Sequence, residues 1–182
     1  MTQAPHELDL VVDFVNTLDL EKGSDELVGQ GLDDWFAAHE LWADEAAPLG
    51  DSDHAQAARL REALRALMLA NNGGTPDDQA GGELELIARR GGLGIHFAPD
   101  GTVALAPSSQ DFAGSLARLL VPVARASSDG SWRRVKACRA ADCRWAFYDR
   151  SRNHSGVWCD MAVCGNRTKV RAYRKRAPRS GA

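Results

Sequence analysis

One stretch decides how the C-terminal part of the chain folds: residues 138–176 read CRAADCRWAFYDRSRNHSGVWCDMAVCGNRTKVRAYRKR. It contains all four cysteines of the 182-residue chain, as Cys138-x4-Cys143, then fifteen residues, then Cys159-x4-Cys164. Zinc takes four ligands in a tetrahedron, and two cysteine pairs on short turns can converge on one ion. The spacing therefore predicts one zinc bound by these four cysteines.

Two other interpretations of the cysteines remain open. Free cysteine is often a buried apolar residue, but the pairing and clustering here argue against four independent core thiols. Disulfides are disfavoured in a reducing compartment. His154 lies between the two pairs and could replace one cysteine as a ligand. Four protein ligands leave no open coordination position, so we expect a structural metal rather than a catalytic one.

A basic segment follows the last cysteine. It reads NRTKVRAYRKR and predicts a helix from Asn166, which can cap it, to about Arg176. Helical spacing places three arginines on one face, and such a cationic ridge neutralises phosphates. The loop DRSRN adds further charge. The candidate nucleic-acid-binding residues are therefore Arg150, Arg152, Arg167, Lys169, Arg171, Arg174 and Lys175. The alternative is that these side chains pair with carboxylates elsewhere in the chain.

The net charge is divided unevenly along the chain. Residues 1–130 contain 8 Lys and Arg against 22 Asp and Glu, a net charge of −14. Residues 131–182 contain 14 against 3, a net charge of +11. Such asymmetry indicates different partners for the two parts. We therefore expect an acidic, mostly helical domain over 1–130 and a basic zinc module over 131–182.

Hydrophobic periodicity predicts the elements of the N-terminal domain. Helices are expected over residues 6–18, 32–42, 53–70, 77–90 and 110–126, with Pro122 kinking or shortening the last one. A β-hairpin with arms 93–98 and 102–106 turns at Asp100-Gly101. The predicted fold class is α+β, mainly α: a helical domain with one hairpin, then a small zinc module made of a β-hairpin and a helix.

Aromatic residues are expected to pack around the metal. Residues 145–149, between the cysteine pairs, are expected to form one strand of a hairpin within that insert. The predicted small core consists of Trp132, Trp145, Phe147, Trp158, Val170 and Tyr173.

At these residues the chain resembles the CGNR zinc-finger proteins, whose N-terminal domain is called ABATE. The matching residues are Cys138, Cys143, Trp145, Phe147 to Asn153, Trp158, Cys159, Met161 and Cys164 to Arg167. The segment Asp13 to Thr17, DFVNT, also resembles the opening motif of the family. The resemblance implies a mainly helical domain with some strand, followed by a zinc module. It also implies a role in bacteria as a stress-induced transcription regulator.

No constellation of residues indicates an enzyme. The five histidines are scattered, and the sequence has no phosphate-binding loop or nucleophile-elbow motif. Asp13, Asn16 and Thr17 are candidate ligand-binding residues of a sensor pocket; the alternative is that they form hydrogen bonds at a helix end or between domains. No apolar run is long enough to span a membrane, and the N-terminus does not resemble a secretory signal, so we expect a cytoplasmic protein with no membrane partner.

The expected function is that of a zinc-dependent, DNA-binding transcription regulator. The basic module contacts DNA, and the helical domain senses a small-molecule ligand or forms a homodimer. Two alternatives remain: an interaction module whose basic zinc finger docks on an acidic protein surface, and a helical domain that binds a small molecule, as a receptor or an unrecognised enzyme.

Overall fold

The computed structural model of the chain describes residues 6–42 and 48–176. The elements are α1 (His6–Asn16), β1 (Leu18–Asp19), β2 (Ser24–Asp25), α2 (Gly31–Ala38), α3 (Asp51–Asn71), α4 (Asp78–Arg90), β3 (Leu93–Phe97), β4 (Val103–Pro107), α5 (Phe112–Arg118), α6 (Leu120–Asp129), the 3-10 turn η1 (Ser131–Arg134), β5 (Val135–Ala137), β6 (Ala146–Tyr148), the π-helical turn η2 (Met161–Gly165) and α7 (Asn166–Arg176). The strands form three antiparallel pairs. The predicted fold class is confirmed: helices dominate, and the sheets are small.

Helix α3 is the centre of the molecule. Its residues Leu60, Leu64 and Met68 are completely buried and lie at helical spacing, as expected of a helix that turns one face to a core. The helix packs against α1, α4 and α5, and also against β5 of the C-terminal segment. Phe14 of α1 and Phe36 of α2 complete the core with ring centroids 6.1 Å apart.

A break after Leu119 divides the predicted 110–126 helix into α5 and α6. Pro122 explains the break, because proline has no amide hydrogen and its ring clashes with the carbonyl four residues earlier, at Arg118. Within α6 the proline lies in the first turn, where an amide donor is not needed. The expectation that Pro122 shortens the helix is therefore confirmed.

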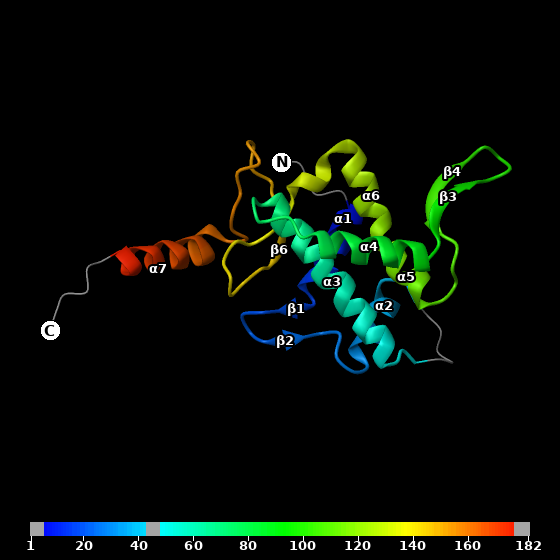
Figure 1. Cartoon of the computed structure of the whole chain (residues 1–182), viewed down its shortest axis with the longest axis horizontal. Helices are drawn as coiled ribbons and strands as arrows, with labels where there is room; N and C mark the ends of the chain where they lie inside the picture. The colour runs from blue at the N-terminus through cyan, green and yellow to red at the C-terminus, as the bar shows by residue number, and fades with distance from the viewer. Residues whose placement is uncertain (1–5, 43–47, 177–182) are drawn as a thin grey trace.

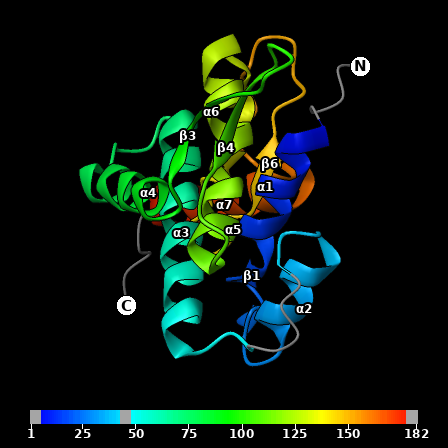
Figure 2. The same ribbon diagram turned by 90° about the vertical axis from the view of Figure 1, so that its right-hand side faces the viewer.

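The two ends of the molecule differ in character. Helix α7 extends from the body at one end, and the β3–β4 hairpin projects at the other (Figure 1). Viewed from the hairpin end, α3, α4, α5 and α1 surround the core while α7 lies behind it (Figure 2). Within the described ranges, no helix combines the length and apolar character that crossing a bilayer requires.

The C-terminal hairpin differs from the expected one. Strand β6 pairs with β5, which precedes the first cysteine, with Val135 opposite Tyr148. The strand was expected to find its partner between the two cysteine pairs. Val135, Ala137 and Ala146 belong to the main hydrophobic core, as does Trp132, which was expected beside the metal. This pairing occurs because β5 covers α3, so the hairpin gains more apolar contact there than an isolated insert would.

Candidate metal centre and basic helix

Tight backbone turns bring the first cysteine pair together. Cys138 directly follows β5, and its amide donates to the Trp145 carbonyl at 2.9 Å. The Cys143 amide donates to the Ala140 carbonyl at 3.0 Å and closes the turn. The next residue, Arg144, has a φ of 55°, an uncommon value for a residue with a side chain. The turn thus directs both sulfurs to the same point.

A π-helical turn presents the second pair. Cys164 lies in η2, whose first turn is capped by Asp160, since its Oδ1 accepts from the Val163 amide at 3.0 Å. The helical path therefore begins before Asn166, the residue expected to cap it; the Asn166 side chain donates to the Ala162 carbonyl instead. A β-carbon on Gly165 would lie 2.5 Å from Met161 Sδ and 3.0 Å from the Trp158 ring, so glycine fits this crowded turn.

The four sulfurs fit a tetrahedral zinc site. The ligand atoms of Cys138, Cys143, Cys159 and Cys164 all lie within 4.8 Å of one another. Cys159 Sγ lies 3.6 Å from Cys143 Sγ and 3.7 Å from Cys164 Sγ. Four thiolates at about 2.3 Å from one ion would have sulfurs about 3.8 Å apart. The described contacts are close to this separation and far longer than a disulfide bond.

The charge of the cluster also favours a cation. Burial raises the pKa of Cys143 to about 11 and raises that of Cys159 as well. Burial opposes ionisation of Cys138 too, but amide hydrogen bonds from Cys159 and Ala140 outweigh it and lower the Cys138 pKa. Several adjacent thiolates are unfavourable without a compensating charge. A divalent ion would supply that charge, and metal binding would release the thiol protons.

Two family models match the chain in the order in which its parts occur. Residues 134–177 match the CGNR zinc finger, and residues 8–129 match ABATE, described as "Putative stress-induced transcription regulator". The chain belongs to the ABATE family. The suspected resemblance is thereby confirmed for the ABATE domain and for its CGNR zinc finger. A search of curated proteins finds no match.

Two arginines of the predicted ridge are paired in the structure. Arg167 in α7 makes a bidentate ion pair with Glu21 of the ABATE domain, at 2.7 and 3.0 Å. Its Nη2 also donates to Cys164 Sγ at 3.5 Å, so it links the metal cluster to the other domain. Arg171 makes a bidentate pair with Asp142 of the zinc finger itself, at 3.0 and 2.8 Å.

The other predicted nucleic-acid-binding residues face solvent. Arg150, Arg152, Lys169 and Arg174 are exposed and have no ion-pair partner among residues 6–42 and 48–176. The side chain of Lys175 lies outside the described residues. The Val170 and Tyr173 side chains, expected to point inward, are 47% and 72% exposed. Exposed side chains thus extend along α7 from Lys169 to Arg174 among those that the structure describes.

The DFVNT segment connects the two domains. Asn16 donates to the Ala146 carbonyl at 3.0 Å and accepts from the Ala146 amide at 2.7 Å, so it clamps β6. Thr17 donates to the Phe14 carbonyl and accepts from buried Arg61. These two side chains therefore make the helix-end and interdomain hydrogen bonds of the alternative interpretation. Asp13 is different, because it lines a cavity on the surface of α1.

Sequence reasoning missed several buried polar residues that join the domains. Arg65 of α3 donates to the carbonyls of Val15 and Arg144, at 2.7 and 2.9 Å. Asn72 donates to the carbonyls of Ala137 and Val157, both at 2.8 Å. In the sequence Arg65 looks like an ordinary polar position of an amphipathic helix, and Asn72 lies in the polar segment that follows the helix. One feature of the sequence could have indicated the role of Arg65: it directly follows Leu64, beside the apolar stripe of the helix.

The loop between the cysteine pairs is held by a buried ion pair. Lys136 Nζ lies 2.6 Å from Asp149 Oδ2, and it also donates to the carbonyls of His154 and Gly156. Burial opposes ionisation of Asp149, but hydrogen bonds from Lys136 and Ser151 outweigh it and lower the Asp149 pKa to about 2. These contacts anchor the basic loop to strand β5.

Proposed function

We propose that the protein is a transcription regulator whose CGNR zinc finger, built on one structural zinc, binds DNA through α7. The observation that supports this most directly is that Arg150, Arg152, Lys169 and Arg174, which flank the four-cysteine cluster in the sequence, are exposed and lack an ion-pair partner among the described residues. Half or more of protein–DNA hydrogen bonds go to phosphate and sugar, and Lys and Arg supply many of them. Helix α7 projects from the body of the molecule, and a projecting helix can enter a major groove (Figure 1).

DNA binding should depend steeply on salt. Replacing Lys169 and Arg174, two exposed cations of α7, with Gln is expected to lower the slope of log K against log salt by about 2, because each lost phosphate contact contributes about 0.9. Fluorescence anisotropy with a labelled duplex between 50 and 300 mM salt, about the range over which such slopes are resolved, would measure this. Arg89→Gln, on the exposed face of α4, is the matched control and should leave the slope unchanged. Absence of binding to DNA and RNA even at low salt would overturn the proposal.

A second candidate function is protein docking, and the Arg167–Glu21 pair favours it. In that case the basic helix binds acidic protein surfaces and does not bind nucleic acid. The same titration distinguishes the two candidates. If α7 is the DNA face, Glu21→Gln should strengthen DNA binding, because it removes the bidentate partner of Arg167 and a negative charge beside α7. If docking is the function, the substitution should leave DNA affinity undetectable.

We also propose that the β3–β4 hairpin is a contact between two copies of the chain. Phe97 lies opposite Val103 and Ile95 opposite Leu105, so these side chains share one face of the hairpin. Ile95, Phe97 and Val103 are 65%, 78% and 58% exposed, and exposed apolar patches mark interaction sites. Sedimentation equilibrium should show a dimer that Phe97→Asp converts to monomer, with Asp100→Asn at the hairpin turn as control. Raising the protein concentration 100-fold favours association by about 2.7 kcal/mol. A wild-type protein that stays monomeric over that range would contradict the contact.

A further inference from the structure

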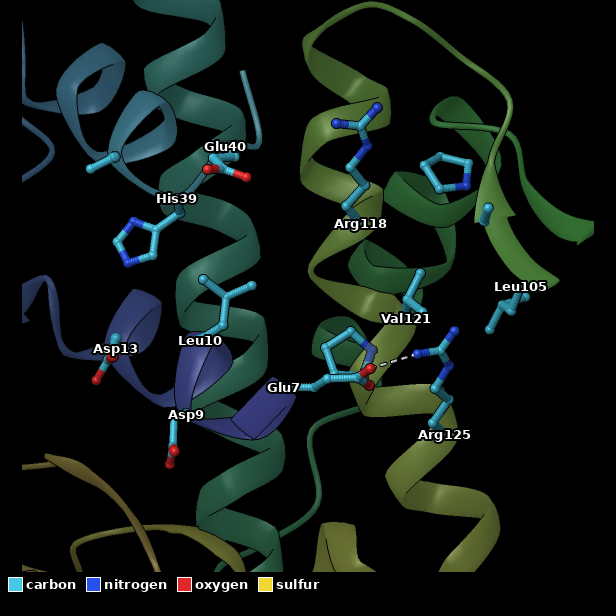
Figure 3. A pocket seen from close by; sticks show the side chains of 14 residues that line it. Glu7, Asp9, Leu10, Asp13, His39, Glu40, Leu105, Arg118, Val121 and Arg125 are labelled. Carbon is cyan, nitrogen blue, oxygen red and sulfur yellow. Dashed lines mark hydrogen bonds and ion pairs between the residues drawn. The ribbon is translucent and has the colours of Figure 1, made fainter. Parts of the chain in front are cut away.

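A cavity of about 730 Å³ lies in the ABATE domain, beside α1 and α6. Helices α1 and α2 form one wall, and α5, α6 and strand β4 form the other (Figure 3). Leu10, Leu105, Val121 and Pro122 provide apolar surface between charged side chains. Small-molecule sites typically occupy about 300–1,000 Å³, with an apolar lining and a few polar groups. Both the size and the lining of this cavity are of that kind.

The two walls have opposite charge. Asp9, Asp13 and Glu40 lie on the α1–α2 wall, and Arg118 and Arg125 lie on the facing wall (Figure 3). A ligand that spans the cavity would therefore meet carboxylates at one end and a guanidinium at the other.

One pair of charges across the cavity is already satisfied. Arg125 lies 2.8 Å from Glu7, and this ion pair closes one end of the cavity. The charges of Asp9 and Asp13 have no ion-pair or hydrogen-bond partner among residues 6–42 and 48–176. Within the described part of the chain, the one hydrogen bond of Arg118 goes to the Leu41 carbonyl, at 3.3 Å. Opposite, uncompensated charges thus remain on both sides of the apolar surface.

The acidic wall is energetically unfavourable as it stands. Asp9 and Asp13 are four residues apart on α1, where like charges repel. Burial and the charge of Asp9 raise the pKa of Asp13, although nearby His39 opposes the shift. His39 is held in place by stacking on Trp35 at 4.0 Å and by its Nδ1 hydrogen bond to the Trp35 carbonyl. A bound cation would relieve the repulsion between the two carboxylates.

The turn after α2 borders the cavity at Glu40. The φ of Glu40 is 56°, as in the left-handed residue that commonly ends a helix. In this turn the Glu40 amide donates to the Ala37 carbonyl at 3.0 Å, and the Leu41 amide donates to the Phe36 carbonyl at 2.9 Å. The turn therefore fixes the Leu41 carbonyl, which accepts from Arg118.

We propose that this cavity binds a zwitterionic molecule with an apolar middle, of the class of short apolar peptides. The ammonium group is held by Asp13 and Asp9, the carboxylate by Arg118, and the apolar side chains lie on Leu10, Leu105 and Val121. The inference rests on the proposed function, since it names the ligand that the ABATE domain would sense. Helix α1 provides the connection, because Asp13 is one turn before Asn16, which clamps strand β6 of the zinc finger.

Binding of free apolar di- and tripeptides to the full-length, zinc-loaded protein tests the proposal by isothermal titration calorimetry. We expect saturable binding to members of a Leu, Val and Phe peptide set. N-acetylation of the best peptide should weaken it at least tenfold, and C-terminal amidation should do the same. Asp13→Asn should remove the penalty of acetylation, and Arg118→Gln should remove the penalty of amidation. Glu83→Gln, on α4 outside the cavity, is the control.

Two results would overturn the proposal: no saturable binding by any member of the set, or binding that survives both capping reactions unchanged. If Asp13→Asn fails to fold, the capped peptides still give the answer with the wild-type protein. These measurements contain no DNA. A failure of the peptide experiment is therefore distinguishable from a failure of DNA binding, which is measured on the peptide-free protein.

Discussion

Replacing Cys164 with Ser should abolish zinc binding and unfold residues 157–176, while α3 and the ABATE core keep their structure. Few apolar side chains other than Ala140, Trp145 and Trp158 pack around the four sulfurs, so the metal must supply most of the stability of this region. Structural zinc in finger peptides contributes an apparent binding free energy of about 10–16 kcal/mol at neutral pH. Loss of one thiolate removes much of it.

The unfolding should stop at the β5–β6 hairpin. Val135, Ala137 and Ala146 belong to the main core rather than to the metal cluster. Asn16 and Asn72 hold this hairpin through hydrogen bonds that do not involve the metal. Lys136 of β5 also holds loop residues 149–156 without the metal, through Asp149 and the carbonyls of His154 and Gly156, so the unfolded boundary should fall after residue 156.

Hydrogen exchange measured by mass spectrometry should show protection lost over 157–176 and retained over 135–148 and in α3. Elemental analysis should give about one zinc per wild-type chain and none in Cys164→Ser, as four thiolates complete one shell. His154→Asn is the control: asparagine tolerates the left-handed backbone at this position, where φ is 52°, and zinc content should not change. A native protein that is fully folded without metal would contradict the prediction.

Local patterns were sufficient to predict most elements and the cysteine cluster. The apolar stripe of α3, the Asp-Gly turn of the β3–β4 hairpin and the spacing of Cys138 to Cys164 all depend on residues near one another in the sequence. Pro122 also acts on its own helix. These features are encoded locally, and so the sequence predicts them without knowledge of the packing.

The connections between the domains depend on residues far apart in the sequence. Asn16 and Ala146 are 130 positions apart, and Arg65 and Arg144 are 79 apart. A polar side chain on a helix has the same appearance whether it faces water or a buried carbonyl. The position of β5 on α3 decides which occurs, and that position follows from burial over the whole core. The cavity, similarly, exists only because α1 and α6 converge.

Asp149→Ala should destabilise the zinc-loaded protein by about 3–5 kcal/mol, because it leaves the Lys136 ammonium buried without its counter-charge. The two side chains are 2% and 6% exposed, so water cannot replace the lost carboxylate. Urea unfolding would measure the loss, with Glu85→Gln on exposed α4 as the control, expected within about 0.5 kcal/mol of wild type.

Replacing both residues, Lys136→Met with Asp149→Leu, should recover part of the stability lost in Asp149→Ala. The recovery is incomplete because the Ser151 and Gly156 amides lose their acceptor.

The pH dependence of the unfolding free energy tests whether the charge of Asp149 causes this stabilisation. The pKa of Asp149 is about 2 in the folded protein, against about 3.9 for aspartate in an unfolded chain. Since the folded pKa is depressed, the stabilisation is complete above about pH 5 and is lost as the pH falls towards 2. The difference in unfolding free energy between wild type and Asp149→Asn should therefore be constant from pH 8 to 5 and shrink below pH 4. Loss of zinc at low pH affects both proteins and cancels in this difference. A gap that stays unchanged at pH 3, or that widens between pH 5 and 8, would show that shape and hydrogen bonding, rather than the charge of Asp149, stabilise the loop.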